Sequence, residues 1–205
     1  MVPTFDEEER LRAQGYRLVA GIDEAGRGPL AGPVVAAAVV LPWERRPYWL
    51  SLLRDSKQLT AQARDFLFDC IQGDGASFGV GLATHEVVDE YGIVAATRLA
   101  MSRAVAQLSD RLDFLLIDYL ALPELDIPQR SIVKGDNLSF SIAAASIVAK
   151  VARDRLMLQY DRQFPGYGLA HNKGYGTLEH MEILRRLGPC PIHRRTFSPV
   201  QELLR

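Results

Sequence analysis

The sequence predicts an α/β fold built on a mixed sheet that is antiparallel at one edge and parallel at the other. The order of the elements supports this prediction, because three strand patterns come first and further strands then alternate with helical patterns. The chain has 205 residues, 48% of them hydrophobic, which is enough for one sizeable core. Its last stretch, about residues 165–205, has the pattern of a helical appendage without a core of its own.

Five segments have the pattern of strands. Residues 17–23 form the first, and residues 33–41 form the second, which is apolar on both faces and is therefore expected to be deeply buried. The third, residues 76–83, is expected to run antiparallel to its neighbour. The last two, residues 113–118 and 129–136, each end in an acidic residue.

Helical patterns fill most of the remaining chain. Helices are expected over residues 61–72, 92–108, 139–162 and 178–187, with a solvated turn at residues 5–10 and a short turn starting at Thr84. Thr60 and Thr177 are suited to cap two of these helices, and Gly188 with Pro189 is suited to end the last one. The helix over 139–162 is rich in small residues, which allow close packing against a sheet. Residues 42–49 and 164–176 are expected to be loops.

Charge and cysteine content exclude several classes of protein. The formal net charge is −1, but residues 1–125 carry 12 Lys and Arg against 18 Asp and Glu, while residues 126–205 carry 12 against 7. This polarity fits either a basic face for nucleic acid beside an acidic site, or ordinary surface scatter. Cys70 and Cys190 make neither a disulfide framework nor a zinc site, and Cys70 is expected in the core. Without a signal peptide or a membrane-length apolar run, we expect a soluble, cytoplasmic protein.

Four acidic residues follow the predicted strands: Asp23, Glu24, Asp118 and Asp136. Ligands usually bind at such strand ends. Two bare carboxylates ~4 Å apart repel by roughly 4 kcal/mol at an effective dielectric near 20, so a cluster must take up protons or hold cations. Oxygen ligands select Mg²⁺ or Mn²⁺, and two such ions can clamp a phosphodiester. The alternative is that each acid is a turn residue or a helix cap.

Neighbouring residues of a regular strand point to opposite faces, so Asp23 and Glu24 cannot both reach one site from it. Either the strand bends there, or Glu24 contributes its backbone carbonyl. Gly26 and Gly28 supply backbone freedom and a close approach to a ligand, and Arg27 between them is suited to hold a phosphate.

Six segments resemble, in order, motifs of the bacterial ribonuclease HII family of type 2 ribonucleases H. They are GIDEAGRGPLAGPVV, DSKQLT, IVKGD, SIAAASIVAKVARD, NKGYGT and HRRTF, and they span about residues 18–200. The resemblance implies a ribonuclease-H-like, mixed five-stranded sheet flanked by helices. It also implies a catalytic domain over residues 1–164, with residues 165–205 forming a helical extension packed on the same domain.

The family's activity would make this chain an endoribonuclease that hydrolyses the RNA strand of RNA–DNA hybrids. It would also cut 5′ of ribonucleotides embedded in duplex DNA, leaving a 3′-hydroxyl and a 5′-phosphate by a two-metal mechanism. The four acids would bind two ions, Mg²⁺ or Mn²⁺, with Asp23 and Asp118 bridging or nearly bridging them. Residues Gly26, Arg27 and Gly28 would line a pocket for the 2′-hydroxyl, and Tyr175 would stack on the deoxyribose beside the RNA–DNA junction.

Four further residues are candidate phosphate contacts. The resemblance implies that Ser56 and Lys57 meet the DNA strand. Ser146 and Lys150 lie four residues apart on one helix face and could touch a phosphate. An equally weighted alternative is that Lys150 pairs with Asp154, which is expected to be structural.

The other basic residues and histidines receive lesser roles. Arg194 and Arg195 are expected to serve the basic surface or the docking of the tail. His171, His180 and His193 have no ligand spacing, and we expect them on the surface or in the core. Two positions depart from the family pattern, Gly92 in place of asparagine and Asn172 in place of histidine, and they put substrate affinity in question.

Three rival interpretations remain. The sibling ribonuclease HIII typically adds an N-terminal substrate-binding domain, and only some 17 residues precede the first strand here. A catalytically inactive nucleic-acid-binding module on the same fold is disfavoured because all four acids are present. The tail, residues 201–205, faintly resembles a peptide that binds the sliding clamp. The sequence gives no oligomeric signal, so a monomer is the default expectation.

Overall fold

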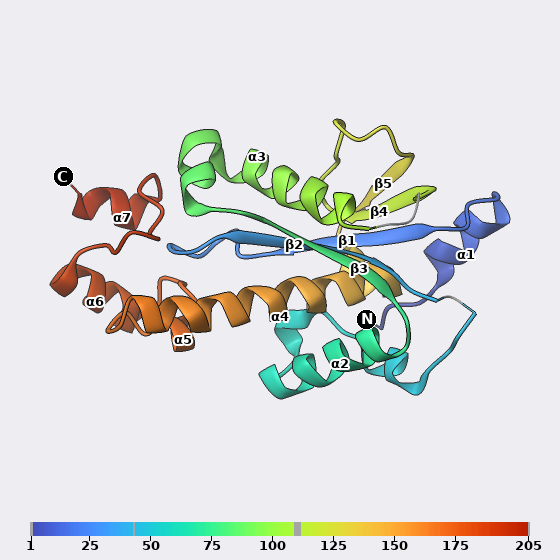
Figure 1. Cartoon of the computed structure of the whole chain (residues 1–205), viewed down its shortest axis with the longest axis horizontal. Coiled ribbons are helices and arrows are strands. Elements are labelled where there is room, and N and C mark those ends of the chain that lie inside the picture. Colours follow the sequence, from blue (N-terminus) through green and yellow to red (C-terminus); the bar gives the residue numbers. More distant parts are fainter. Residues whose placement is uncertain (1, 43, 109–111, 205) are drawn as a thin grey trace.

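A five-stranded mixed sheet forms the centre of the computed structural model, which describes residues 2–42, 44–108 and 112–204 (Figure 1). The strands are β1 (Val19–Ala25), β2 (Val34–Val40), β3 (Ser77–Ala83), β4 (Phe114–Asp118) and β5 (Gln129–Ile132). They lie in the order β3-β2-β1-β4-β5. β1, β2 and β3 pair antiparallel, whereas β1, β4 and β5 pair parallel, so the predicted mixed sheet is confirmed.

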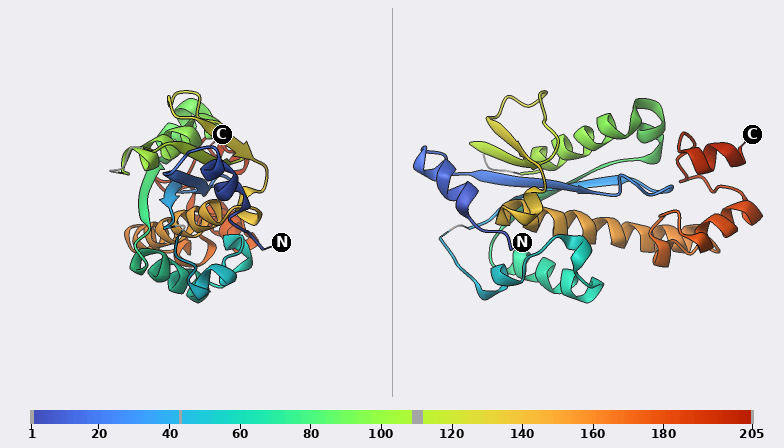
Figure 2. Two further views of the ribbon diagram at one scale, coloured as in Figure 1. Left: turned by 90° about the vertical axis from the view of Figure 1, so that its right-hand side faces the viewer. Right: turned by 180° about the vertical axis from the view of Figure 1, so that it is seen from behind.

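The helices cover both faces of this sheet. They are α1 (Asp6–Ala13), α2 (Ala61–Gly73), α3 (His85–Ala106), α4 (Phe140–Gln163), α5 (Leu169–Asn172), α6 (Leu178–Leu187) and α7 (Ser198–Leu203). Three short 3-10 turns add η1 (Tyr48–Leu52), η2 (Ser56–Gln58) and η3 (Gly135–Asn137). α3 lies on one face of the sheet and α4 on the other, with α2 outside α4 (Figures 1 and 2).

Several local predictions are confirmed by the hydrogen bonds. The Thr60 and Thr177 hydroxyls accept the backbone N–H groups of Ala63 and His180, each at 3.2 Å, as N-caps do. Within α3, Gly92 has a φ of 80°, which divides the helix at the point where the sequence predicts a second stretch. The predicted loops are partly wrong, because α5 lies inside residues 164–176 and η1 begins within 42–49.

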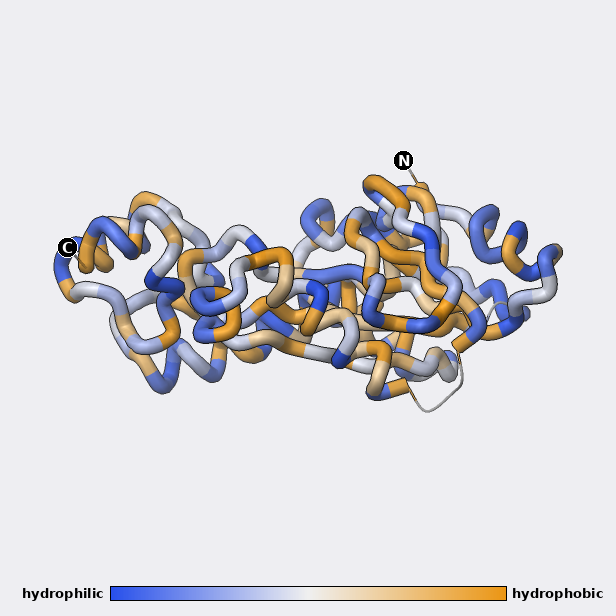
Figure 3. Tube along the Cα trace, turned by 90° about the horizontal axis from the view of Figure 1, so that it is seen from above, coloured by the Kyte–Doolittle hydropathy of each residue, from blue (hydrophilic) through white to orange (hydrophobic). Residues whose placement is uncertain are grey.

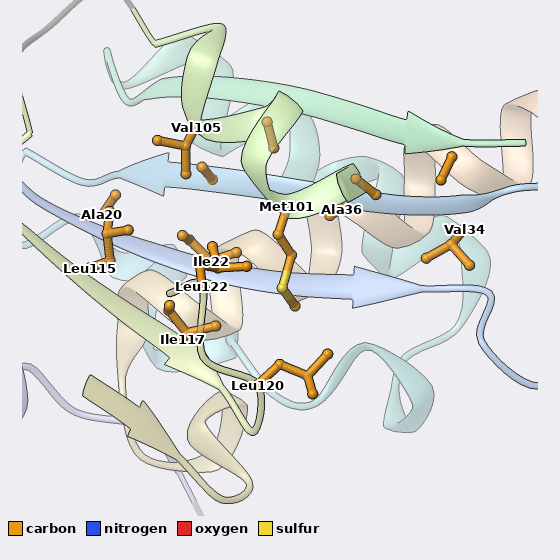
Figure 4. Close-up of a cluster of buried hydrophobic side chains, with 14 of the residues drawn as sticks. Ala20, Ile22, Val34, Ala36, Met101, Val105, Leu115, Ile117, Leu120 and Leu122 are labelled. Atoms are coloured by element: carbon orange, nitrogen blue, oxygen red, sulfur yellow. The ribbon is translucent and has the colours of Figure 1, made fainter. Parts of the chain in front are cut away.

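β2 shares its side chains between two cores because both of its faces are covered. Ala36 and Ala38 belong to the core under α3, whereas Ala37 and Val39 belong to the core under α4. In the first core, Met101 of α3 packs with residues of the neighbouring strands (Figure 4). The predicted burial of this strand on both faces is therefore confirmed.

Small residues let both long helices approach the sheet closely. A Cβ atom on Gly81 of β3 would lie 2.1 Å from the Ala100 carbonyl oxygen of α3, and one on Gly21 of β1 would lie 2.1 Å from the Ser141 carbonyl carbon of α4. Real side chains do not tolerate such distances, so glycine is required at both positions. The alanines at positions 143–145 and 149 of α4 are all fully buried, as expected from their size.

The predicted strand over residues 129–136 is too long. β5 ends at Ile132, Lys134 adopts a left-handed conformation with a φ of 57°, and Asp136 lies in η3. Gly135 packs where a Cβ atom would be 2.6 Å from the Ile142 side chain, so the chain leaves the sheet to pass beneath α4. Asp136 therefore reaches its position from a turn and does not end a strand.

α5, α6 and α7 gather at one end of the molecule, where the C-terminus also lies (Figures 1 and 2). α5 packs on α4 and on the loop after β1 through a small cluster that includes Ala31, Met157 and Leu169, whereas α6 and α7 pack on Leu30 of that loop through Leu184 and Val200. Hydrophilic and hydrophobic residues alternate along the helices at both ends of the molecule (Figure 3). Among the described residues, no helix is both long and apolar enough to cross a membrane.

Candidate active site

A cleft of about 1340 Å³ lies at the carboxyl ends of β1 and β4. All four predicted acids line it, together with most of the other predicted site residues: Gly26, Arg27, Gly28, Ser56, Lys57, Lys150 and Tyr175. These residues come from two strands, two 3-10 turns, two loops and one helix, so only the folded chain brings them together.

Strand register places Asp23 beside Asp118. In the parallel pairing of β1 with β4, Ile22 lies opposite Ile117, and the next residue on each strand is an aspartate. Asp118 Oδ1 accepts the Gly135 backbone N–H at 2.7 Å, which fixes η3 against the end of β4. Because Asp136 follows Gly135 directly, this hydrogen bond also holds the fourth acid at the cleft.

The Glu24 carboxylate takes part in the site although β1 stays extended through Ala25. Asp23 Oδ1 accepts the backbone N–H of Glu24 at 2.7 Å. Glu24 Oε1 receives a hydrogen bond of 3.2 Å from Arg27, whereas Glu24 Oε2 is buried without a hydrogen-bond partner. A buried oxygen in this state is open to a ligand, and because β1 stays extended, both the carboxylate and the backbone carbonyl of Glu24 are candidate donors.

Burial and crowding raise the pKa of each acid. Burial is the main cause for Asp23, whose pKa lies well above its usual value, and the charges of Glu24 and Asp118 add to it. Burial also raises the pKa of Glu24, Asp118 and Asp136. Both causes disfavour the charged forms of the acids, so a bound cation would stabilise the ionised cluster.

Lys57 and Asp55 complete the electrostatics of the cleft. Burial alone would lower the pKa of Lys57, but the carboxylates of Asp55, Asp23 and Asp136 raise it overall. Asp55 also raises the pKa of Asp118 and Asp136, after burial. The carboxylates thus gather around Lys57, while Arg27, Lys134 and Lys150 also line the cleft.

The acids fit divalent ions that share their ligands with a substrate. Within the described parts of the chain, no three His, Cys, Asp or Glu side chains are arranged to hold one ion by themselves. Mg²⁺ usually binds to one or two carboxylates and completes its octahedron with water and substrate phosphates. The unpartnered Glu24 Oε2, the oxygen-only ligand set and the mutual repulsion around Asp23 all fit such ions.

The loop after β1 faces Tyr175 across the cleft. Gly26 has a φ of +94°, and a Cβ atom on it would lie 2.1 Å from Arg153 Nε. A Cβ atom on Gly28 would meet only Tyr175 within 4 Å, at 3.9 Å from Cε1. Tyr175 is 42% exposed, so its ring is open to a ligand.

The structure separates the two helical phosphate candidates. Ser146 is buried and donates a hydrogen bond to its own helix, at 3.1 Å from the Ala143 carbonyl oxygen, and it does not line the cleft. Lys150 lines the cleft and also donates to Asp154 Oδ1 at 2.6 Å. Both alternatives for Lys150 are therefore compatible, whereas Ser146 is not positioned to touch a ligand.

Sequence reasoning missed several residues of the cleft, notably Asp55, Tyr119, Lys134 and Asn137. Asn137 donates to Asp136 Oδ1 at 2.8 Å, and Asp55 accepts the backbone N–H of Lys57 at 2.9 Å. Asp55 directly precedes the Ser56-Lys57 pair that the sequence did single out, so its charge could have been noticed. The positive φ values of Tyr119 and Lys134 leave no comparable trace in the sequence.

Residues given lesser roles are mostly structural. His180 and His193 are buried, and Asn172 is buried with its side chain bonded to Tyr167 and Gly174 in the loop before Tyr175. Asp154 binds Lys150 and Arg64, as a structural acid would. Cys70 was predicted to lie in the core, but its side chain is only half-buried.

Comparisons with known proteins agree on one family. The family model described as Ribonuclease HII matches residues 20–200. A protein named Ribonuclease HII from Dehalococcoides mccartyi is 52% identical over 98% of this chain and 95% of its own length. The crystal structure of the ribonuclease H2 from Pyrococcus horikoshii OT3 superposes with a TM-score of 0.73 at 26% identity, covering 91% of this chain and 97% of that chain.

A second solved structure supports the fold alone. It is the PCNA:RNase HII complex from Archaeoglobus fulgidus, with a TM-score of 0.75 at 24% identity over 92% of this chain and 97% of that chain. The match extends over the sheet and its helices, as expected for a ribonuclease-H-like fold.

Proposed function

This chain belongs to the ribonuclease HII family of metal-dependent endonucleases, and we propose that the cleft at the ends of β1 and β4 is its active site. It hydrolyses the RNA strand of RNA–DNA hybrids and cuts 5′ of ribonucleotides embedded in duplex DNA. The observation that carries the assignment is one cleft lined by four carboxylates and by a loop that faces Tyr175. The inactive-module alternative is not favoured, since no acid is missing.

In this proposal the four acids would hold Mg²⁺ or Mn²⁺, and Asp23 and Asp118, side by side at the strand ends, would be the central ligands. Divalent ions, when bound, lower the pKa of a water molecule and stabilise negative charge on the leaving 3′-oxygen. Arg27 and Asn137 orient the Glu24 and Asp136 carboxylates through their hydrogen bonds. The products would be a 3′-hydroxyl and a 5′-phosphate.

The loop after β1 would select the ribonucleotide. The Gly26–Gly28 backbone can approach a sugar closely, and a 2′-hydroxyl is the group that distinguishes RNA from DNA. The exposed Tyr175 ring would stack on the next deoxyribose, and Ser56 with Lys57 would contact a phosphate of the DNA strand. Together they would place the scissile phosphate over the acids.

We assign residues 1–164 to the catalytic domain and 165–205 to a helical extension that contributes Tyr175. The support is that α5–α7 pack on α4 and on the loop after β1. One chain supplies every residue of the proposed site, so we propose that it acts as a monomer. We propose that it works in the cytoplasm, where bacterial chromosomal DNA lies.

The C-terminal tail is a separate candidate for binding the sliding clamp. Leu203 and Leu204 are 37% and 49% exposed at the end of α7, and clamp-binding peptides need accessible apolar side chains. The final residue of this tail, Arg205, lies outside the described residues. Deleting residues 201–205 should abolish binding to the clamp and leave cleavage intact. Clamp binding that survives the deletion would exclude this tail.

The decisive experiment uses a DNA duplex that carries one ribonucleotide, incubated with Mg²⁺, Mn²⁺ or chelator, with the ends of the products mapped. A metal-dependent cut 5′ of the ribonucleotide, lost in Asp118→Asn and kept in the control Asp154→Asn, is the expected result. Cleavage of continuous hybrids alone would remove the role given to Tyr175 and the glycine loop. Binding without cleavage in either metal would favour the inactive module.

A further inference from the structure

Two buried arginines, far apart in the sequence, hold the same loop. Arg153 of α4 and Arg194 of the C-terminal segment are both fully buried. Their guanidinium groups face the chain that joins β1 to β2, which carries Gly26, Arg27 and Gly28. Of the two roles predicted for Arg194, burial excludes the basic surface, whereas its hydrogen bonds to the loop fit the docking of the tail.

Arg194 binds the loop entirely through backbone carbonyls. Its guanidinium donates to Gly26 at 2.6 Å, to Arg27 at 2.8 Å and to Gly32 at 2.9 and 3.1 Å. Arg194 thereby joins both ends of the loop. It also fixes the orientation of the Gly26 and Arg27 carbonyls, which lie before and after the Arg27 N–H group in the chain. A planar group with five donors is suited to this, whereas a lysine ammonium is not.

Arg153 links this loop to the one that presents Tyr175. It donates to the carbonyl oxygens of Pro33 and Ala31, each at 3.1 Å, and to that of Lys173 at 3.0 Å. Its guanidinium carbon also lies 6.0 Å from the centre of the Tyr175 ring. The glycine at position 26 makes this approach possible, because any Cβ there would collide with Arg153 Nε.

The two charges lack the partners that buried arginines normally have. Neither forms an ion pair with a carboxylate among the residues that the structure describes. Burial lowers the pKa of Arg194 to about 9, and the positive charge of Arg153 contributes to this. Burying like charges together is costly, so the arrangement calls for an explanation beyond ordinary packing.

We propose that Arg153 and Arg194 are positioning residues that fix the Gly26–Gly28 backbone against Tyr175 and so set the preference for a single ribonucleotide. The proposal rests on the proposed function, in which this loop and this ring read the RNA–DNA junction. Their charges, which Asp154 and Asp89 offset without forming ion pairs with them, also place positive potential beneath the loop that would meet a phosphodiester.

The test compares kcat/KM on two substrates, a DNA duplex with one ribonucleotide and a duplex with a continuous RNA strand. The ratio of the two values does not depend on the fraction of enzyme that is folded. For Arg194→Lys, Arg194→Gln and Arg153→Lys we expect this ratio to fall at least tenfold. The control Arg195→Lys, at the exposed neighbouring position, should keep the ratio within twofold.

Three results would overturn the proposal. An unchanged ratio, or the loss of both activities together, would assign these arginines to the fold alone. A ratio that Arg194→Lys preserves and Arg194→Gln loses would show that charge, and not the carbonyl contacts, is what matters. Failure of the unaltered protein to cut the single-ribonucleotide duplex would instead refute the proposed function, so the two failures are distinguishable.

Discussion

Gly28 lies directly opposite the ring of Tyr175, with 3.9 Å between Tyr175 Cε1 and the point where a Cβ atom on Gly28 would stand. That distance is ordinary van der Waals contact, so the glycine is not required by packing. The gap between Gly28 and the ring is about one methyl group wide, so a ligand would lie beside it, in the cleft that both residues line.

The first prediction concerns Gly28→Ala. The added methyl group would prevent a ribose in the cleft from approaching the Gly28 backbone closely, so we expect KM for a single-ribonucleotide duplex to rise at least tenfold. The thermal midpoint should change by about 1 °C or less, since the methyl group meets nothing closer than 3.9 Å. Steady-state kinetics and a thermal melt on the same preparation measure both quantities.

Gly26→Ala is the matched contrast two residues away. Gly26 has a φ of +94° and its added Cβ would collide with Arg153, so we expect a loss of about 2–4 kcal/mol in the free energy of unfolding. Urea denaturation measures this loss. Equal stability of the two alanine variants would contradict the geometry of the loop.

The second prediction concerns Asp23→Asn in the absence of metal. The raised pKa of Asp23 means that the folded state disfavours its charge, first through burial and then through Glu24 and Asp118. Stability from this group is greatest below its unfolded pKa and falls as pH rises through the folded value. At pH 7 in chelator the neutral asparagine should therefore raise the thermal midpoint by about 2–4 °C, the equivalent of about 1 kcal/mol.

Divalent ions should give the unaltered protein a higher thermal midpoint than Asp23→Asn, the reverse of the order expected in chelator. Mg²⁺ or Mn²⁺ should stabilise the unaltered protein and have little effect on Asp23→Asn, which should lose at least a hundredfold in activity. Asp154→Asn is the control, because Asp154 binds Lys150 and Arg64 and should keep the response to metal. A lower midpoint for Asp23→Asn in chelator would show that the crowding of charge has been overestimated.

The sequence predicted that the four acids share one site, and they do line one cleft, three of them from the strand ends that the prediction relied on. β1 and β4 have apolar patterns that end at Asp23-Glu24 and Asp118, and a local pattern is enough to find such ends. Asp136 was predicted as the end of a strand, but the chain leaves β5 at Ile132 because Gly135 packs against Ile142 in α4. That contact joins η3 to α4, and no local sequence pattern predicts it.

The two arginines of HRRTF, Arg194 and Arg195, show a similar limit. Arg194 and Arg195 are equivalent in sequence, yet Arg194 is fully buried and Arg195 is exposed. The difference arises from the Gly26 and Gly32 carbonyls more than 160 positions away in the chain, to which Arg194 donates. Ser146 and Lys150 likewise share a helix face, but only Lys150 reaches the cleft.

The third prediction separates the two roles of Lys150. It lines the cleft while paired with Asp154, so we expect Lys150→Gln to weaken binding of a hybrid and to reduce the slope of log K against log salt by about 1. Ser146→Ala should leave both quantities unchanged, because its hydroxyl is bonded to Ala143 inside the helix. If Lys150→Gln left the salt slope unaltered, Lys150 would not contact a phosphate, and its role would be the ion pair with Asp154.

The fourth prediction concerns the buried histidine pair of the C-terminal extension. His180 Nε2 and His193 Nε2 lie 3.1 Å apart, and His193 Nδ1 lies 3.1 Å from Cys190 Sγ. Burial, with a contribution from His180, lowers the pKa of His193 from 6.5 to about 4. The unfolded chain therefore takes up a proton near pH 6.5 that the folded chain refuses until about pH 4.

The difference between the folded and unfolded pKa values of His193 sets the direction in which stability changes with pH. Stability is complete above pH 6.5 and is lost as pH falls toward 4, by about 2 kcal/mol between pH 7.5 and pH 5 for this one residue. His193→Gln should be less stable at pH 7.5 but should lose less stability on acidification, whereas His171→Gln, at an exposed position, should keep the full slope. Urea denaturation at the two pH values measures both effects. If His193→Gln retained the slope of the unaltered protein, the acid sensitivity would have to come from groups outside this pair.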